Sequence, residues 1–292
     1  MGPGNTDPVT GRATTGHEWN GIEELETPIP RVVLFFLAVT TLFAIVYWIL
    51  MPAWPVGATY TRGLLGIDQR QVVARQVQDA AAERAAWAER IASEDLAALA
   101  ADPAIMTHVK ETGRTLFIDN CAACHGVTAG GGPGFPNLKA GSWLWGGDPD
   151  ALAETIRVGI NSTHDETRVS QMMAFGHDGM LDRGAILAVA AYVRSLSGQE
   201  LTNTERGRLD AGRLVFADNC ASCHGDDGAG VIEVGAPDLA DANWIYGGDA
   251  QSVFTTINAG RQGHMPHWER RLSPTDIRLL ALYVGSLKEA RP

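Results

Sequence analysis

The sequence predicts an all-α protein, in which one N-terminal transmembrane helix is followed by two tandem copies of a helical module. Three observations support this fold class: a run of residues without a charge near the N-terminus, an internal repeat, and apolar side chains at helical spacing with no evident strand pattern. The chain has 292 residues, which exceeds one typical domain and leaves room for both copies.

The composition is that of a folded, acidic protein. Hydrophobic residues make up 45% of the chain and charged residues 20%, which excludes wholesale disorder. The formal net charge is -11 and no basic patch emerges, so nucleic acid is not an expected partner. The four cysteines fall in two tight pairs, which are too few for a disulfide scaffold.

The uncharged run extends over 20 residues from Val32 to Met51. At about 1.5 Å per residue it spans about 30 Å, the thickness of a bilayer core. Aromatic residues lie near its end, as in an interfacial belt, and Pro52 then stops the helix. The run starts too late and is too long for a cleaved signal peptide, and it exceeds the usual length of a buried core helix. We therefore expect a transmembrane helix in the lipid bilayer.

These features divide the chain into five parts. We expect an N-terminal segment (1–30), the transmembrane helix (31–53), a helical linker (54–107) and two module copies (108–198 and 199–292). The linker is rich in Ala, Arg, Gln and Glu, which favour helices.

The internal repeat is visible in three pairs of matching segments. GRTLFIDNCAACHG (113–126) matches GRLVFADNCASCHG (212–225), WLWGGD (143–148) matches WIYGGD (244–249), and AYVRSL (191–196) matches LYVGSL (282–287). In each copy two helical segments enclose a loop rich in Gly and Pro. The last helix opens at Ser273 with a capping-box pattern. Modules of this kind have little core of their own, so a large prosthetic group would account for their stability.

Each copy carries one C-x-x-C-H motif. The motif residues are Cys121, Cys124 and His125 in copy one, and Cys220, Cys223 and His224 in copy two. This motif is the attachment signal for c-type haem: each thiol forms a thioether to a vinyl group, and the histidine ligates the iron. We therefore expect two covalent haem c groups.

Two other uses of paired cysteines fit less well. A four-cysteine zinc site usually has about 15–20 residues between its pairs, and the gap here is 95. A thioredoxin-like pair needs a βαβ context, which the sequence lacks. Haem attachment in bacteria takes place outside the cytoplasmic membrane. We therefore expect a single-pass protein of the bacterial inner membrane, with residues 1–30 cytoplasmic and residues beyond 54 periplasmic.

Methionine is the expected sixth ligand of each iron. Met265 lies 41 residues after the motif histidine of copy two, and Met172 and Met173 lie 47 and 48 residues after that of copy one. Matched placement favours ligation over core filling, and a thioether ligand raises the potential of the iron. We prefer Met172, because Met173 takes the place of Pro266; Met180 is a weaker candidate. Both ligands of each iron would then come from the same copy.

Histidine is the alternative sixth ligand. The candidates are His264 and His267 in copy two, and His164 and His177 in copy one; His17 and His108 are interpreted as surface residues. A ligating histidine usually donates its other N–H to a carbonyl, for which Pro136 and Pro237 are candidates. Four aromatic residues either hydrogen-bond the haem propionates or only pack against the haem: Trp143, Trp145, Trp244 and Tyr246.

Two segments near the apolar run, together with the motifs, carry a family resemblance. They are HEWNGIEELETPIPR (17–31) and RGLLG (62–66). With them, nearly the whole chain resembles the dihaem subunit (subunit III, or P subunit) of cbb3-type cytochrome c oxidase. The resemblance implies two tandem class I cytochrome c domains and no catalytic residue in this chain.

The resemblance also implies a role and partners. The subunit would accept electrons from a soluble or membrane-anchored cytochrome c and relay them to the monohaem subunit. From there they would reach the catalytic haem–copper subunit, where oxygen is reduced to water with proton pumping. Residues 102–200 carry 7 basic and 11 acidic side chains, and residues 201–292 carry 9 and 12. Such a surface would attract a basic cytochrome c, although mild acidity also serves solubility.

Three other functions remain open at this point. A dihaem carrier of another respiratory complex would share all the motifs. A dihaem peroxidase would have one iron with an open or displaceable site, which paired methionines argue against. A gas-sensing haem protein would bind carbon monoxide tightly.

Overall fold

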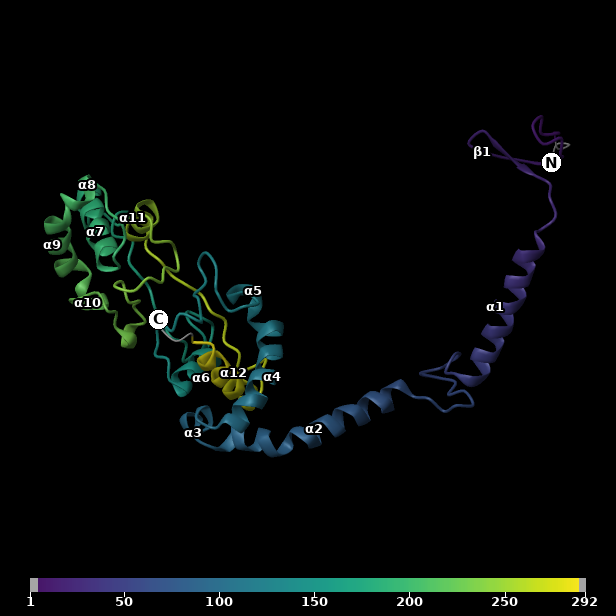
Figure 1. Ribbon diagram of the computed structural model, residues 1–292, viewed down its shortest axis with the longest axis horizontal. Coiled ribbons are helices and arrows are strands. Elements are labelled where there is room, and N and C mark those ends of the chain that lie inside the picture. The colour runs from purple at the N-terminus through teal and green to yellow at the C-terminus, as the bar shows by residue number, and fades with distance from the viewer. Residues whose placement is uncertain (1–4, 289–292) are drawn as a thin grey trace. The chain divides into compact units, whose positions relative to one another are not determined.

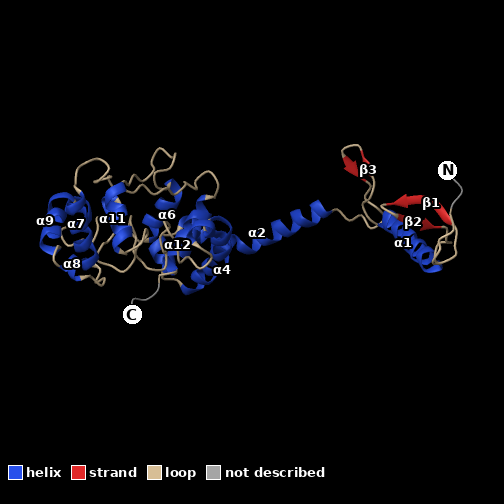
Figure 2. Ribbon diagram, turned by 90° about the horizontal axis from the view of Figure 1, so that it is seen from above, coloured by secondary structure: helices blue, strands red, loops and turns tan. Residues whose placement is uncertain are grey.

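The computed structural model describes residues 5–288, and helices account for most of its regular structure (Figure 2). The chain divides into two compact units, one ending at Ala82 and the other beginning at Glu83. The helical architecture, with one long apolar helix near the N-terminus, confirms the predicted all-α class.

The first unit contains the apolar helix and two small hairpins. The pairs are β1 (Thr14–Trp19) with β2 (Ile22–Leu25), and β3 (Pro55–Val56) with β4 (Thr59–Tyr60), both antiparallel. Asn20 and Gly21, at the turn of the first hairpin, have φ values of 52° and 85°. The sequence-based prediction did not include this hairpin, although Asn-Gly is a strong hairpin signal that favours positive φ at both positions.

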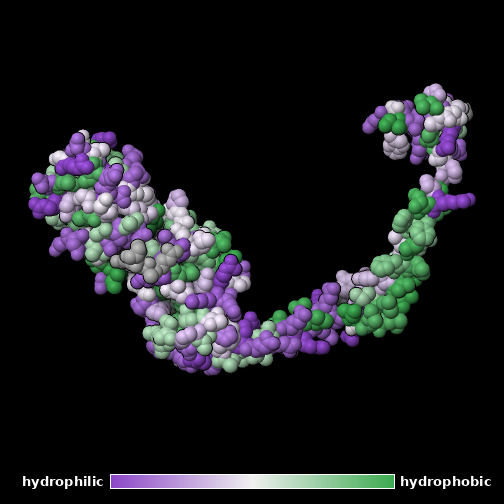
Figure 3. Space-filling model, viewed as in Figure 1, coloured by the Kyte–Doolittle hydropathy of each residue, from purple (hydrophilic) through white to green (hydrophobic). Residues whose placement is uncertain are grey.

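Helix α1 (Arg31–Leu50) is the expected apolar helix. It follows Pro30, and none of its residues is buried within the unit. Figure 3 shows it as an almost continuous hydrophobic segment. A helix that is apolar all round needs either a protein core or lipid around it. Its length and exposure therefore support membrane anchoring.

Helix α2 (Gln69–Ser93) forms in the linker, as the composition of this stretch predicts. Near its end, the guanidinium of Arg90 lies 2.7 Å from the carboxylate of Glu94 and 3.0 Å from that of Asp102. Asp102 also caps the next helix by accepting a hydrogen bond from the N–H of Ala104 at 2.9 Å. The end of the linker helix is thus tied to the start of copy one.

The second unit consists of short helices joined by loops (Figure 1). The linker also contains α3 (Leu96–Ala100) and the start of α4 (Pro103–Asn120), which continues into copy one; α5 (Ala122–His125), α6 (Pro149–Val158) and α7 (Arg183–Leu196) follow in copy one. Copy two contains α8 (Asn203–Arg206), α9 (Leu209–Asn219), α10 (Ala221–His224), η1 (Ile232–Val234), α11 (Ala250–Ala259) and α12 (Pro274–Ser286). Ser273 caps α12 with the capping box that the sequence predicts.

The two copies exchange their last helices. Helix α12 of copy two packs against α4 and α6 of copy one, whereas α7 of copy one packs against α9 and α11 of copy two (Figure 1). Two hydrophobic cores result, one around Phe117 and one around Phe216. The boundary between 198 and 199 therefore separates the sequence repeats, but each core contains segments from both.

Glycines allow the exchanged helices to approach closely. A Cβ on Gly113 of α4 would lie 2.6 Å from the Cβ of Tyr283 on α12. A Cβ on Gly212 of α9 would collide with the backbone of Ala188 and lie 2.8 Å from the Cβ of Tyr192, both on α7. The contact of α4 with α12 and the contact of α9 with α7 thus have the same geometry, and each joins a helix of one copy to a helix of the other.

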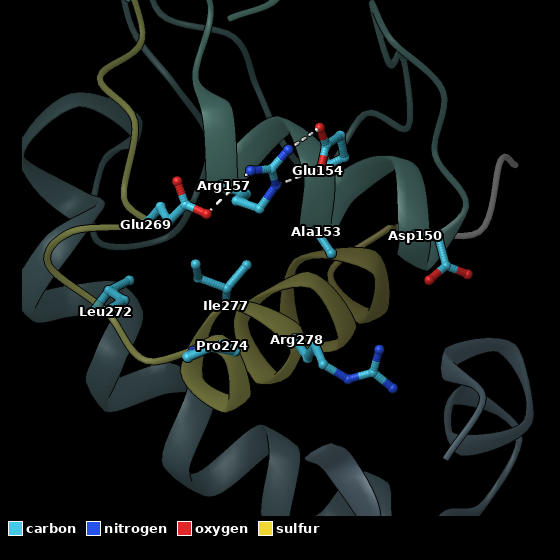
Figure 4. A pocket seen from close by; sticks show the side chains of 9 residues that line it. All are labelled: Asp150, Ala153, Glu154, Arg157, Glu269, Leu272, Pro274, Ile277 and Arg278. Atoms are coloured by element: carbon cyan, nitrogen blue, oxygen red, sulfur yellow. Dashed lines mark hydrogen bonds and ion pairs between the residues drawn. The ribbon is translucent and has the colours of Figure 1, made fainter. Parts of the chain in front are cut away.

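A shallow pocket of about 470 Å³ lies on the seam between α6 and α12 (Figure 4). Arg157 of α6 crosses from one copy to the other: its Nε lies 2.8 Å from Glu154, and its Nη1 lies 3.1 Å from Glu269 of copy two. The charged walls and open position of this pocket fit a packing seam better than an interior that holds a haem.

Candidate haem sites

The two C-x-x-C-H motifs have the same local structure. In copy one the N–H of Cys121 bonds to the carbonyl of Phe117 at 2.8 Å, and the N–H of His125 bonds to the carbonyl of Cys121 at 3.0 Å. The corresponding bonds in copy two have the same lengths. Each motif therefore forms a tight turn at the end of a helix, with the first cysteine packed against a hydrophobic core.

A proline carbonyl orients each motif histidine. Nδ1 of His125 lies 3.2 Å from the carbonyl oxygen of Pro136, and Nδ1 of His224 lies 3.0 Å from that of Pro237. These are the two carbonyls that the sequence singles out. With Nδ1–H donating to a carbonyl, Nε2 is the nitrogen that can bind a metal.

Burial keeps both imidazoles neutral. It lowers the pKa of His125 and of His224, although the hydrogen bond to the proline carbonyl acts in the opposite direction. A neutral imidazole is the form that ligates iron. The electrostatics therefore fit an axial ligand at each motif.

None of the four cysteines is paired in a disulfide, and their surroundings argue against zinc. Burial raises the pKa of Cys121 and of Cys220 to about 11, whereas Cys124 and Cys223 are exposed. Zinc needs thiolates, and residues 5–288 contain no group of three or more His, Cys, Asp or Glu side chains placed to hold a metal ion. Pairs of thiols next to a histidine instead fit covalent haem attachment.

The backbone of each candidate methionine is held by the other copy. The N–H and the carbonyl of Met265 both bond to Ile160, each at 2.9 Å. The N–H and the carbonyl of Met172 both bond to Arg261, at 2.8 and 3.0 Å. A Cβ on Gly159 would collide with the carbonyl of Met265, and the equivalent Gly260 has the same relation to Met172.

In this arrangement each motif lies near the methionine of the other copy, and not near the methionine of its own copy as expected. Met265 packs against the core that contains Cys121, and Met172 packs against the core that contains Cys220. The sequence predicted both ligands of each iron from one copy. The structure instead brings the motif of each copy together with the methionine loop of the other, because the loops cross with the exchanged helices.

Position in the sequence and exposure distinguish Met172 from the other candidate methionines of copy one. Arg168 precedes Met172 by four residues, as Arg261 precedes Met265. Met172 is half-buried, whereas Met173 is 52% exposed and Met180 is 43% exposed. The geometry therefore favours Met172 as the equivalent of Met265.

The histidine alternatives are engaged elsewhere or exposed. Nε2 of His164 lies 2.7 Å from Glu269, and its Nδ1 accepts a bond from the N–H of Glu166 at 3.0 Å. His267 lies edge-on beside His164, and Nδ1 of His264 donates to the carbonyl of Asn161 at 2.9 Å. His17, His108 and His177 are exposed. Methionine remains the better-placed sixth ligand.

Three buried donors without a hydrogen-bond partner fit the acidic edge of a haem. They are Nε1 of Trp145, Nε1 of Trp244 and Nε of Arg168. A buried polar group without a partner is costly, so such donors indicate a missing acceptor. Burial also lowers the pKa of Arg168, although the charges of Glu154 and Asp148 act in the opposite direction. Haem propionates would supply the acceptors.

The other predicted aromatic residues take different roles. Trp143 packs against the core of the first motif. Tyr246 lies under the guanidinium of Arg261, at 4.4 Å from its ring centroid. In the same way Arg168 lies 5.1 Å from the ring centroid of Trp145. Neither arginine was among the predicted site residues, although each precedes its methionine by four residues, which the sequence shows.

Replacing Trp145 or Trp244 with phenylalanine is expected to lower the midpoint potential of one haem by about 20–60 mV. This range corresponds to the loss of one hydrogen bond of about 0.5–1.5 kcal/mol to a propionate, which leaves more negative charge near the iron. A redox titration checks it. Trp87→Phe is the control, because Trp87 stacks on His108 and its indole is not among the buried donors without a partner; an equal shift in that variant contradicts the assignment.

Three family models match the chain. The model described as the N-terminal domain of cytochrome oxidase-cbb3, FixP, matches residues 11–58. The model described as cytochrome c matches residues 110–197, and the one described as cytochrome c oxidase, cbb3-type, subunit III matches residues 207–284. The chain thus has two cytochrome c domains, which indicates that it binds haem c.

Curated relatives match nearly end to end. The chain is 46% identical over 281 residues to the cbb3-type cytochrome c oxidase subunit FixP of Bradyrhizobium sp. (strain ORS 278), covering 96% of both chains. It is 45% identical over 276 residues to the subunit CcoP of Cereibacter sphaeroides, covering 94% of both. With its apolar helix and two cytochrome c domains, the chain belongs to the FixP/CcoP family of cbb3-type cytochrome c oxidase subunits.

Proposed function

We propose that this chain is a membrane-anchored dihaem electron relay of a cbb3-type oxidase. The observation that carries the proposal is the pair of matched sites, each with a histidine oriented by a proline carbonyl and a half-buried methionine packed against the same core as the first motif cysteine. Bound haem c would supply reversible one-electron chemistry, which amino-acid side chains lack.

Each site would draw its ligands from both copies. Site one comprises Cys121, Cys124, His125 and Met265, and site two comprises Cys220, Cys223, His224 and Met172. The methionine loops would hold a sixth ligand in place for each haem, because both backbone groups of each methionine are hydrogen-bonded to the other copy. A closed position suits electron transfer and argues against a peroxidase or a gas sensor.

The surroundings suit repeated electron transfer with little rearrangement. The proline carbonyls hold the imidazoles, and the buried Trp145, Trp244 and Arg168 donors are available to the propionates. Rigid packing of this kind keeps the same ligands in both oxidation states. The chain itself would not reduce oxygen.

The proposed path runs from a cytochrome c donor through this chain to the monohaem subunit and then to the catalytic haem–copper subunit. There oxygen is reduced to water with proton pumping. Helix α1 would anchor the chain in the inner membrane, with residues 1–30 cytoplasmic and the haem domains periplasmic. This topology follows from the side of the membrane on which c-type haem is attached.

Haem counting tests the proposal directly. The purified oxidase should show two c-type haems in this chain by mass spectrometry and pyridine haemochrome. Replacing both cysteines of either motif with alanine should leave one haem and stop oxidation of a cytochrome c donor. A chain with free thiols, or a variant with one haem that transfers electrons at the full rate, would refute the relay.

A further inference from the structure

Four large apolar side chains lie exposed on two neighbouring segments of the second unit, and together they form what we call the apolar patch. They are Val169 (69% exposed), Met173 (52%), Ile232 (54%) and Val234 (44%). The hydroxyl of Ser170 donates to the carbonyl of Gly235 at 3.3 Å and joins the two segments.

The apolar patch borders site two. Met173 directly follows Met172, and η1 lies in the loop between His224 and Pro237. Exposure alternates along 169–173, so Met172 turns inward while Val169 and Met173 face solvent. The patch therefore lies on two segments next to Met172 and His224, the candidate ligands of site two.

Site one lacks this combination. The positions equivalent to Val169 and Met173 are Gln262 and Pro266, and neither is a large apolar residue. Copy one also has a Gly-Gly-Pro-Gly turn where copy two has Ile-Glu-Val. Its exposed apolar residues in the corresponding loop are Val127 and Phe135. The apolar patch is thus a feature of one haem site and not of the repeat.

Charge distinguishes the two sites in the same way. Between Arg213 and Arg261 the chain has seven Asp and Glu residues and no Lys or Arg. The stretch of copy one between the equivalent arginines, 115–167, has six acidic and two basic residues. Glu233 is exposed between Ile232 and Val234, and Asp226 and Asp227 are exposed in the same loop. Carboxylates therefore accompany the apolar patch.

We propose that the apolar patch is the docking surface for a basic electron-carrying protein, and that electrons enter at site two. This inference rests on the proposed function. Exposed apolar patches with a charged surround mark binding sites, and opposite charge raises the rate of encounter. On docking, the partner would lose one electron and the iron held at His224 would gain it, with no bond made or broken. A basic partner matches the local charge, whereas an acidic one would be repelled.

The first test reverses the charge of Glu233, which lies between two residues of the apolar patch. Glu233→Lys is expected to lower the second-order rate of electron transfer from a basic cytochrome c to the purified oxidase about tenfold at low ionic strength. At high ionic strength the loss should shrink to less than about twofold, because salt screens the charge. Asp119→Lys makes the same charge change on copy one, at an exposed residue, and should cost less than about twofold at either salt concentration.

The second test removes the apolar contact. The double variant Ile232→Ser and Val234→Ser should lower the rate severalfold at both salt concentrations, whereas Val127→Ser on copy one should not. Haem content and the methionine-to-iron absorption band should stay unchanged in all variants. Equal losses in the copy-one controls, or an unchanged rate in Glu233→Lys, would overturn the docking surface. So would loss of other oxidase subunits from the double variant, since the patch would then be a subunit interface. Failure of the relay itself would appear separately, as absent haem in the unaltered chain.

Discussion

Met265→Ala is expected to lower the midpoint potential of the haem attached at Cys121 and Cys124, and to leave the other haem almost unchanged. Met265 packs against the core of Cys121, and its backbone is fixed by Ile160 of copy one. A thioether ligand raises the potential of an iron centre, and axial ligands as a group set potentials over about 0.8 V. We expect a fall on the order of 0.1 V, together with loss of the methionine-to-iron band of that haem.

A one-haem background makes the result unambiguous. With Cys220 and Cys223 replaced by alanine, only site one can carry haem. Met265→Ala should then abolish the remaining band, whereas Met172→Ala should leave it. Met180→Ala is a control, because Met180 is partly exposed and lies outside both cores. The opposite pattern, with the band lost in Met172→Ala, would show that each copy ligates its own iron.

The features that sequence reasoning located correctly are local or repeated. The Ser273 capping box and the proline carbonyls opposite His125 and His224 depend on residues close in the chain. The apolar helix follows from composition alone. The preference for Met172 over Met173 as an iron ligand follows from comparing the two copies and stays a prediction; Met173 is the more exposed of the two.

The exchange of the last helices between the two copies could not be predicted from the sequence. Gly113 could face the tyrosine of either copy, because Tyr192 and Tyr283 occupy equivalent positions and the packing patterns are the same. A physical reason lies in the connection after α7. Only a short stretch containing α8 separates α7 from α9, and helices joined by short connections usually pack against each other. Helix α12 then takes the remaining place on α4.

The ion pair between Arg194 and Glu205 supports this connection. Arg194 lies in the last turn of α7, and Glu205 lies in α8, where it also completes a capping box with Thr202. Both side chains of the pair are largely shielded from solvent. The contact fixes the path of the chain between copies, and no sequence pattern signals it.

Tyr283→Ala is expected to destabilise the core around Phe117 by about 3 kcal/mol, which is the usual cost of truncating a buried aromatic residue. The ring of Tyr283 lies 5.8 Å from that of Phe117, and its Cβ faces Gly113. Since Tyr283 belongs to copy two and Phe117 to copy one, hydrogen exchange should accelerate in α4 and not in α9. Thermal unfolding and amide exchange of the haem-loaded protein measure both effects.

Tyr192→Ala is the matched variant, because Tyr192 lies 5.3 Å from Phe216 in the other core. It should accelerate exchange in α9 and leave α4 protected. If each copy instead packed its own last helix, the two patterns would be reversed, with Tyr283→Ala exposing α9. The tyrosine variants thus test the helix exchange by amide exchange of the backbone, whereas the Met265 and Met172 variants test it by the ligand of each iron. The two tests must give the same answer, because each methionine loop leads directly into an exchanged helix.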